Sequence, residues 1–318
     1  MKGIVNYLSI SNSFHSTDEI TFKEGSFIIY STNVEERSYM PVSYQINQSS
    51  LRLIEIVEDG LETFSLDLDD NRVLVNLRSN TDFDRLVAHF ENATVYLDIT
   101  GLTHSSWAWL IDMLLKRKSG ETFALYSEPD EYKFNENPIG GQIFDLSKRI
   151  LGISPLPRFA KFFQYRPDNF IFMPLLGFEG ARLAHLWEDI QPLKENTYPV
   201  FGVPGFSYSY PFYSYQANKL VLTRESIWHN RRYEKANCPV SIFILGSSII
   251  SDNPEKILRI ALLGTKPHAL GAVLLKLTYP NRVDLIYDHP IRQSKRTTGR
   301  SKTLCYALDV FREKLDKK

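Results

Sequence analysis

Short apolar runs, bounded by turn-forming residues, recur along the whole chain, and longer segments of helical spacing lie between some of them. Continuous apolar runs of this length are typical of strands that are buried on both faces of a parallel sheet. The pattern therefore predicts two sets of buried strands. They are expected over 27–30, 51–57, 73–77, 95–99 and 122–126 in the first half, and over 170–173, 199–203, 240–245, 258–263 and 283–287 in the second.

Helical spacing appears at 104–116 and again at 267–277. In the second segment Leu270 and Leu274 share one face, and Pro267 stands where the first turn of a helix accepts proline. Strands that alternate with helices of this size are typical of βαβ units. The predicted fold class is therefore α/β, with a mostly parallel sheet.

The two halves also carry similar motifs in the same order. Residues 27–38 (FIIYSTNVEERS) match 170–182 (FIFMPLLGFEGAR), each a strand followed by a loop with glutamate and arginine. Residues 95–129 match 258–290, each running strand, loop with threonine and glycine, helix and strand, and each ending with Tyr-x-x-Pro. We therefore expect two Rossmann-like halves, with helices on both faces of each sheet, related by internal duplication. Chance similarity between unrelated βαβ segments is the alternative.

The expected organisation is an N-terminal Rossmann-like half over 1–133, a connector over 134–168 and a C-terminal half over 169–318. The sequences PIGG and SPLP mark the connector, because they interrupt the chain without a strong period. The offset between matched motifs grows along the chain, which indicates an insertion at 201–240. A basic segment follows at 289–302.

Composition narrows the class of protein. The chain has 318 residues with 37 basic and 37 acidic side chains, which argues against a general cationic coat but allows a local patch. Cys238 and Cys305 are too few for a disulfide framework or a cysteine-built zinc site. No apolar run approaches the roughly 18 residues of a membrane helix, so we expect a cytoplasmic protein that does not enter a membrane.

One candidate anion site follows the strand expected at 258–263. Ligands of open α/β sheets bind beyond the carboxyl ends of the strands, where the order of the strands reverses. Gly264 allows close approach of backbone, Thr265 is a suitable helix cap, and Lys266 adds a cation beside a helix N-terminus. These three residues predict a phosphate site. The alternative is a plain helix cap with a solvated lysine.

The matching loop of the first half begins with Asp98. A carboxylate at the end of a buried strand requires a partner, which can be a ribose hydroxyl or the backbone of the following loop. No lysine accompanies Asp98, so the first half is the weaker candidate for an anion site.

The basic segment 289–302 (HPIRQSKRTTGRSK) contains no acidic residue. We expect Arg292, Lys295, Arg296 and Arg300 to close over the pocket bordered by Lys266, since arginine forks suit phosphate oxygens. The alternative is a solvated, mobile loop. Nucleic acid is a further possible partner of this segment.

Residues 201–215 (FGVPGFSYSYPFYSY) hold seven aromatic side chains. Aromatic faces stack on bases, and tyrosine is also a frequent anchor of protein interfaces. A protein interface or lid, base stacking, and ordinary core packing are the three alternatives for this segment.

The sequence shows no established catalytic pattern. The histidines lack metal-ligand spacing and no GxSxG motif is present, so neither a metal nor a cofactor is expected. Glu35 and Glu179 each follow a predicted strand and are the candidates for an acid–base residue. An ion pair with a neighbouring arginine is the favoured interpretation of both glutamates.

The segments FIIYSTNVEERS, VYLDITGL with YSEP, FIFMPLLGFEGAR, and LLGTKPHALGA with YDHP carry a resemblance that spans about 27–306. The chain resembles a scattered group of uncharacterised prokaryotic tandem Rossmann-like proteins from defence or mobile-element gene neighbourhoods. More distantly, Gly264, Thr265 and Lys266 resemble a loop of the CRISPR-associated Rossmann-fold (CARF) sensor domains. That resemblance implies binding of a cyclic oligonucleotide, usually across a dimer interface.

Three functional hypotheses follow. The first is a protein that binds a nucleotide or oligonucleotide through its phosphates and acts with partner proteins, or as a homo-oligomer, in prokaryotic antiviral defence. The second is a nucleotide-processing enzyme, such as a glycosidase, phosphoribosyl transferase or hydrolase, with Glu35 or Glu179 as the acid–base residue. The third is a non-catalytic interaction scaffold that uses the aromatic segment.

Overall fold

The computed structural model describes residues 11–15, 19–32, 35–39, 50–136, 143–144 and 146–315. They form two compact units. Unit 1 comprises Met1–Tyr132 together with Thr297–Lys318, and unit 2 is Lys133–Arg296. This division differs from the expected one, because 134–168 belongs to unit 2 and the last residues return to unit 1.

The central sheet of unit 1 is built on four parallel strands. In order across the sheet it contains β1 (Ser11–Phe14), β18 (Thr303–Ala307), β8 (Thr122–Ser127), β7 (Val95–Asp98), β2 (Phe27–Tyr30) and β3 (Arg52–Glu55). Strands β8, β7, β2 and β3 are parallel, whereas β18 pairs antiparallel with β8 and β1 antiparallel with β18. The pairing of β18 explains why the last residues pack in unit 1.

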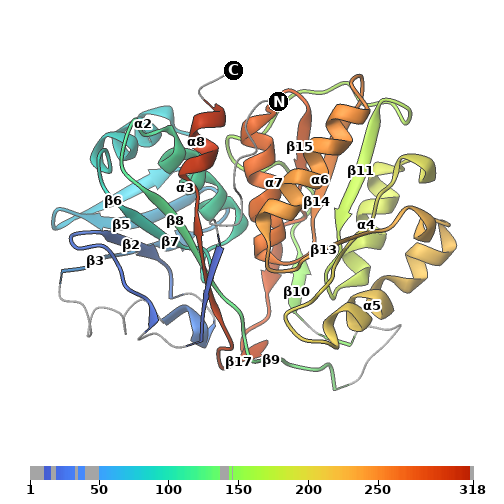
Figure 1. Cartoon of the computed structure of the whole chain (residues 1–318), viewed down its shortest axis with the longest axis horizontal. Helices are drawn as coiled ribbons and strands as arrows, with labels where there is room; N and C mark the ends of the chain where they lie inside the picture. The colour runs from blue at the N-terminus through green and yellow to red at the C-terminus, as the bar shows by residue number, and fades with distance from the viewer. Residues whose placement is uncertain are drawn as a thin grey trace. The chain divides into compact units, whose positions relative to one another are not determined.

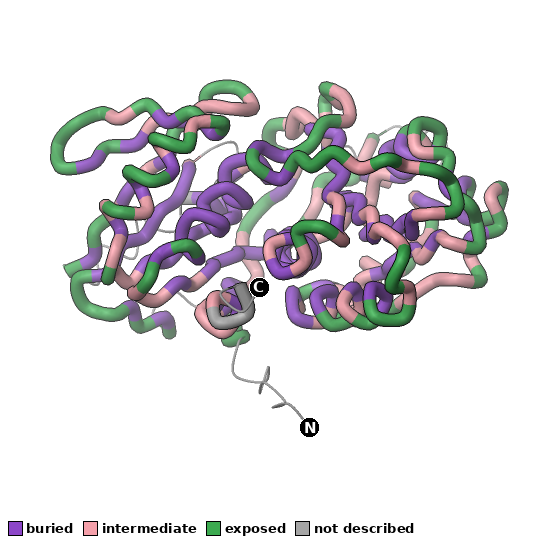
Figure 2. The backbone as a smooth tube through the Cα atoms, turned by 90° about the horizontal axis from the view of Figure 1, so that it is seen from above, coloured by how far each residue is buried: buried purple, intermediate pink, exposed green. Residues whose placement is uncertain are grey.

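Burial follows from the apolar sequence of these strands. Every residue of β2 and of β7 is buried. Buried residues are the purple stretches of the tube in Figure 2. The helices α2 (Asn80–His89) and α3 (His104–Lys116) pack against each other, and α8 (Asp309–Leu315) packs on α3. A second, antiparallel sheet lies between β3 and α2 in the chain. It contains β4 (Val57–Asp59), β5 (Thr63–Leu68) and β6 (Asn71–Asn76).

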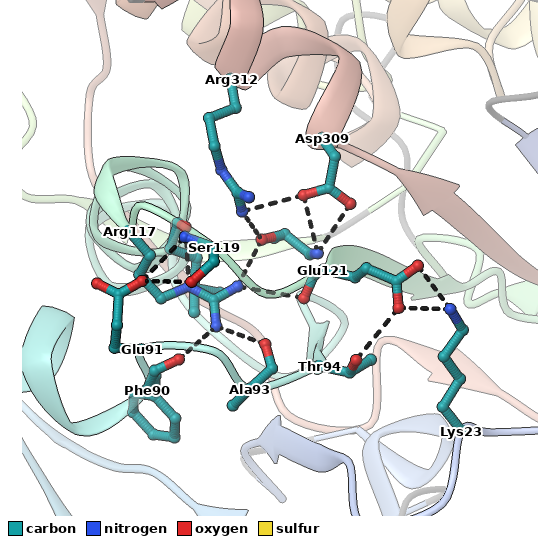
Figure 3. Close-up of polar contacts among 12 residues, drawn as sticks. Lys23, Phe90, Glu91, Ala93, Thr94, Arg117, Ser119, Glu121, Asp309 and Arg312 are labelled. Atoms are coloured by element: carbon teal, nitrogen blue, oxygen red, sulfur yellow. Dashed lines mark hydrogen bonds and ion pairs between the residues drawn. The ribbon is translucent and has the colours of Figure 1, made fainter.

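Arg117 ties together the ends of several elements of unit 1 (Figure 3). Its guanidinium is buried and donates to the carbonyl oxygens of Leu114, Phe90 and Ala93 at 3.0, 2.7 and 2.8 Å. It also donates to the Glu121 carbonyl and the Thr122 hydroxyl at 3.1 and 2.8 Å. A cation suits the carbonyl-rich C-terminal ends of helices. Since Thr122 begins β8, this network lies at the amino end of that strand and has a structural role.

Unit 2 is a five-stranded, all-parallel sheet. In order across the sheet it contains β13 (Arg232–Glu234), β12 (Val200–Gly202), β11 (Phe170–Leu175), β14 (Ile257–Leu262) and β15 (Val283–Ile286). The chain starts at β11, moves to β12 and β13 on one side, then returns to β14 and β15 on the other. The four strands β12, β11, β14 and β15 have the same order as β3, β2, β7 and β8 of unit 1, whereas β13 is an additional edge strand.

Helices cover both faces of the unit 2 sheet (Figure 1). The pair α4 (Gly180–Ile190) and α5 (Tyr210–Arg224) packs together, as does the pair α6 (Pro239–Asp252) and α7 (Lys266–Thr278). Right-handed crossovers that run in opposite directions from β11 place the two pairs on opposite faces. Phe172, Leu183 and Trp187 lie in the core under α4 and α5. The α/β class is therefore confirmed.

The strand predicted at 240–245 is wrong, because these residues belong to α6. Cys238 precedes the helix and Pro239 occupies its first turn, where proline is tolerated. Ile242, Phe243 and Gly246 are buried at helical spacing. The segment 201–240, expected as an insertion, contributes α5 and β13 to the unit. No described helix is both long and apolar enough to pass through a lipid bilayer.

The chain leaves and re-enters unit 1 at two paired strands. β9 (Glu131–Tyr132) pairs antiparallel with β17 (Thr297–Thr298). The basic segment 289–302 therefore does not form one loop. Its first part contains β16 (Pro290–Arg292), which pairs with β10 (Ser147–Ile150) in unit 2, and its last residues belong to unit 1.

Candidate functional site

The carboxyl edge of the unit 2 sheet contains the position where the order of the strands reverses. The loops after β11 and β14 leave neighbouring strands there, and this is where open α/β sheets bind ligands. The two loops approach each other closely. A Cβ atom at Gly177 would lie 2.1 Å from the Leu263 carbonyl oxygen, and one at Gly264 would lie 3.1 Å from the Leu176 oxygen. Glycine is therefore required at Gly177 and favoured at Gly264.

Thr265 caps α7, as predicted. Its hydroxyl accepts from the His268 backbone N–H at 3.3 Å and donates to the Ala236 carbonyl oxygen at 2.7 Å. Lys266 occupies the first turn and is only 8% exposed, so the alternative of a solvated lysine does not hold. The cap and the lysine together make this helix terminus a suitable place for an anion.

His268 contributes a buried polar atom to the same turn. Its Nε2 lies 2.9 Å from the Lys235 carbonyl oxygen, whereas Nδ1 is buried and has no hydrogen-bond partner. Burial lowers the pKa of His268 to about 4, so the ring is neutral near pH 7. With Nε2 donating to the carbonyl, Nδ1 is left as an acceptor.

A buried cluster of charges lies beyond the ends of β11 and β15. Arg182 Nε and Nη2 donate to the two carboxylate oxygens of Asp288 at 2.8 and 2.5 Å. Arg182 Nη1 lies 3.4 Å from Glu179 Oε2, which also accepts from the Ser147 hydroxyl at 3.0 Å. The ion pair predicted for Glu179 is therefore present. Its carboxylate is held by neighbours, as a loop-positioning residue would be.

Tyr287 lies beside this cluster. The guanidinium carbon of Arg182 is 5.8 Å from the centroid of the Tyr287 ring. Burial and the Asp288 charge raise the pKa of the Tyr287 phenol, whereas the charges of Arg182, Arg292 and Arg296 lower it. Arg296 Nη1 donates to the Leu146 carbonyl oxygen at 3.3 Å. Two arginines of the basic segment thus act electrostatically on the same buried phenol as Arg182.

The other basic candidates are placed elsewhere. Lys295 is exposed and has a positive φ of 55° at a turn. Arg300 belongs to unit 1, where its backbone N–H donates to Asp130 Oδ2 at 3.1 Å. Asp98, at the end of β7, is 3% exposed and accepts from the Thr100 backbone N–H at 2.8 Å. This contact supports the reading of Asp98 as a residue that holds its own loop.

Aromatic side chains border the charged cluster. Phe178, which precedes Glu179, lies with its ring centroid 5.3 Å from Tyr210 and 4.8 Å from Phe144. Tyr208 is 99% exposed and Phe212 is 72% exposed, at the start of α5. The segment 201–215 thus has two parts. Phe201 of β12 belongs to the core, whereas Tyr208 and Phe212 expose their rings near the carboxyl edge of the unit 2 sheet.

Unit 1 has a corresponding cluster in the corresponding position. Arg37 lies over the Tyr126 ring at 5.6 Å, as Arg182 lies over Tyr287 at 5.8 Å. Arg37 Nε donates to Glu35 Oε2 at 2.6 Å, so the ion pair predicted for Glu35 is present too. Tyr126 donates its hydroxyl to Glu128 Oε2 at 2.6 Å.

The pKa of the Glu128 carboxyl is strongly shifted in this cluster. Burial raises its pKa to about 7, although the Arg37 charge and hydrogen bonds from Tyr126 and Tyr132 oppose the rise. Glutamates whose pKa is raised to near neutrality are often found at functional sites. Arg37, Glu35 and Tyr126 around it are also buried, which favours a structural role.

The sequence predicted arginine partners for Glu35 and Glu179, but Glu128 and Asp288 were not predicted as members of the two clusters. The signal was present, because both lie within a motif that is matched between the halves, YSEP with YDHP. Within the described parts of the chain, no group of three or more His, Cys, Asp or Glu residues is arranged to hold a metal ion. In comparisons with known proteins, no family model and no curated protein matches this chain.

Proposed function

We propose that unit 2 binds a nucleotide or an oligonucleotide, with its phosphates at the carboxyl edge of the parallel sheet. The observation that carries the proposal is the buried Lys266 in the first turn of the capped helix α7, at the carboxyl edge of the sheet. Arg182 lies over the Tyr287 ring just beyond the same edge, and Arg292 and Arg296 of the basic segment act electrostatically on that phenol. Arginine forks and a capped helix N-terminus are both complementary to phosphate oxygens.

The aromatic side chains support a ligand that also carries bases. Tyr208 and Phe212 are exposed on either side of Tyr210, which contacts Phe178. Bases stack on exposed aromatic rings with about 1–3 kcal/mol each. A simple phosphate or sulfate would contact only the arginines. A nucleotide would contact the arginines with its phosphates and the aromatic rings with its base.

Internal duplication is part of this proposal. The matched strand order and the matched Arg–Tyr contacts of the two units support it. A part in prokaryotic antiviral defence, together with partner proteins, is proposed on the resemblance of the quoted segments alone.

The test is calorimetric titration of the protein with ATP and with the 5′-phosphorylated trinucleotide pApApA. We expect Lys266→Ala combined with Arg296→Ala to weaken binding at least roughly tenfold, since each removes a charge-assisted contact. The matched control is Arg72→Ala with Arg78→Ala, which removes two cations that pair with Asp67 and Glu62 in unit 1. Equal affinity of the Lys266/Arg296 variant and the unmodified protein would refute the assignment.

A further inference from the structure

The free edge of the unit 2 sheet carries an unusual pair of arginines. β13 is the last strand of its sheet, and no described strand pairs with its outer side. Arg231 and Arg232 lie at its start, directly after the short 3-10 helix η5 (Trp228–Asn230). We call Tyr198, Trp228, Arg231, Arg232 and Tyr233 the β13-edge surface.

Arg231 is held between two aromatic rings. Its guanidinium carbon lies 4.3 Å from the centroid of Trp228 and 5.7 Å from that of Tyr233. Its Nε donates to the Tyr233 hydroxyl at 2.5 Å, and Nη1 donates to the Trp228 carbonyl oxygen at 3.1 Å. The side chain is therefore ordered before any ligand arrives, which lowers the entropic cost of binding.

Arg232 is ordered in a similar way on the other face of the strand. It lies 4.7 Å from the centroid of Tyr198, and its Nη1 donates to the carbonyl oxygens of Asn230 and Arg231 at 2.8 and 3.1 Å. Its Nη2 and Nε atoms are not used in these bonds, so donors of the fork remain for an external acceptor.

Neither arginine pairs with a carboxylate among the residues that the structure describes. Arg72, Arg78 and Arg182 show the contrast, since each forms an ion pair with an acidic side chain. Glu225, the nearest acid on the N-terminal side of the two arginines, is engaged elsewhere, because it pairs with Arg224. Two ordered cations without a counter-charge favour an anionic partner.

We propose that the β13-edge surface binds single-stranded nucleic acid, with phosphates on Arg231 and Arg232 and a base on the exposed ring of Tyr233. The side chain of Tyr233 is 51% exposed, so part of it is accessible to a base. Aromatic rings interleaved with arginines are typical of surfaces that bind single strands. An acidic peptide would pair with the arginines but would not stack on the aromatic rings. The proposal does not depend on the α7 site, because no residue is shared.

Binding is measured by fluorescence anisotropy with labelled U20 and dT20 over a series of salt concentrations. We expect Arg231→Ala with Arg232→Ala to weaken binding roughly tenfold or more and to reduce the salt slope by about 1.4, at about 0.7 per lost phosphate contact. Arg72→Ala with Arg78→Ala changes the net charge equally and should have little effect. The proposal fails if the two double variants lose affinity equally, or if the first loses none.

Tryptophan fluorescence supplies a second readout on the unmodified chain. Trp107, Trp109 and Trp187 are buried, whereas Trp228 is only partly buried and lies in the proposed surface. Unlabelled U20 should therefore change an emission component that the Trp228→Phe variant lacks. Polyglutamate should neither change it nor compete for U20. Competition by polyglutamate at equal charge concentration, with no change in Trp228 emission, would assign the surface to an acidic protein and overturn the proposal.

Discussion

Replacing Glu128 by Gln removes a titrating group from the interior of unit 1. Its carboxyl accepts from Tyr126 and Tyr132 and is near Arg37, Glu35 and the buried end of β8. In the folded chain its pKa is about 7, above the ordinary glutamate value of 4.5, because burial disfavours the charged form. The folded state therefore holds this proton more tightly than the unfolded state.

The sign of the pH dependence follows from that difference. The stabilisation from the bound proton is complete below pH 4.5 and is lost as the pH rises through 7. The difference between 4.5 and about 7, at about 1.4 kcal/mol per pKa unit, gives a loss of about 3.5 kcal/mol from Glu128 alone. Glu128→Gln stays neutral at every pH, so its stability should lack this component.

The assay is urea unfolding between pH 4.5 and 8, followed by the emission of Trp107 and Trp109, which report on unit 1. Trp187→Phe and Trp228→Phe remove the signal of unit 2. The control is Glu131→Gln, which removes a carboxyl from an exposed position on β9. If the free-energy difference between Glu128→Gln and its parent stays constant across this pH range, the account of the buried carboxyl is wrong.

Three further substitutions test the packing by differential scanning calorimetry. Arg117→Ala should destabilise unit 1 by about 4 kcal/mol, because it removes five hydrogen bonds to buried and partly buried acceptors. A loss below about 1 kcal/mol would contradict the network. Gly177→Ala should cost about 2 kcal/mol or more, because its Cβ would lie 2.1 Å from the Leu263 oxygen, and an unchanged melting temperature would refute the contact. Asp288→Asn should cost about 3 kcal/mol, because the buried Arg182 loses its bidentate partner, whereas a neutral result would show that Glu179 suffices.

The sequence predicts the central strands well where burial on both faces makes them uniformly apolar. The run at 27–30 forms β2 within the same bounds, and 104–116 forms α3. The run at 240–245 fails because a short apolar run is compatible with a buried helix as well as with a strand. This apolar run is part of a longer helical segment, because α6 extends to Asp252. Gly246 allows close packing of α6 on Leu275 of α7.

Long-range pairings lie beyond such local patterns. Thr265 was predicted as a cap because capping depends on neighbours in sequence. Arg182 and Asp288 are 106 positions apart, and only the parallel order of β11, β14 and β15 brings them together. The antiparallel pairing of β18 with β8 also joins strands that are far apart in sequence. Because of this pairing the last residues belong to unit 1 and not to the second half of the chain.

The interrupted layout of unit 1 has a consequence for synthesis on the ribosome. Strand β18 emerges only after the whole of unit 2, so β8 has an unpaired edge during a delay of roughly ten seconds or more at about 5–20 residues per second. Unpaired edges recruit other strands. Unit 2, continuous in sequence, can fold during that delay, and the part of the chain made first is completed last. A chain stopped before Thr297 would present β8 as a permanent template for aggregation.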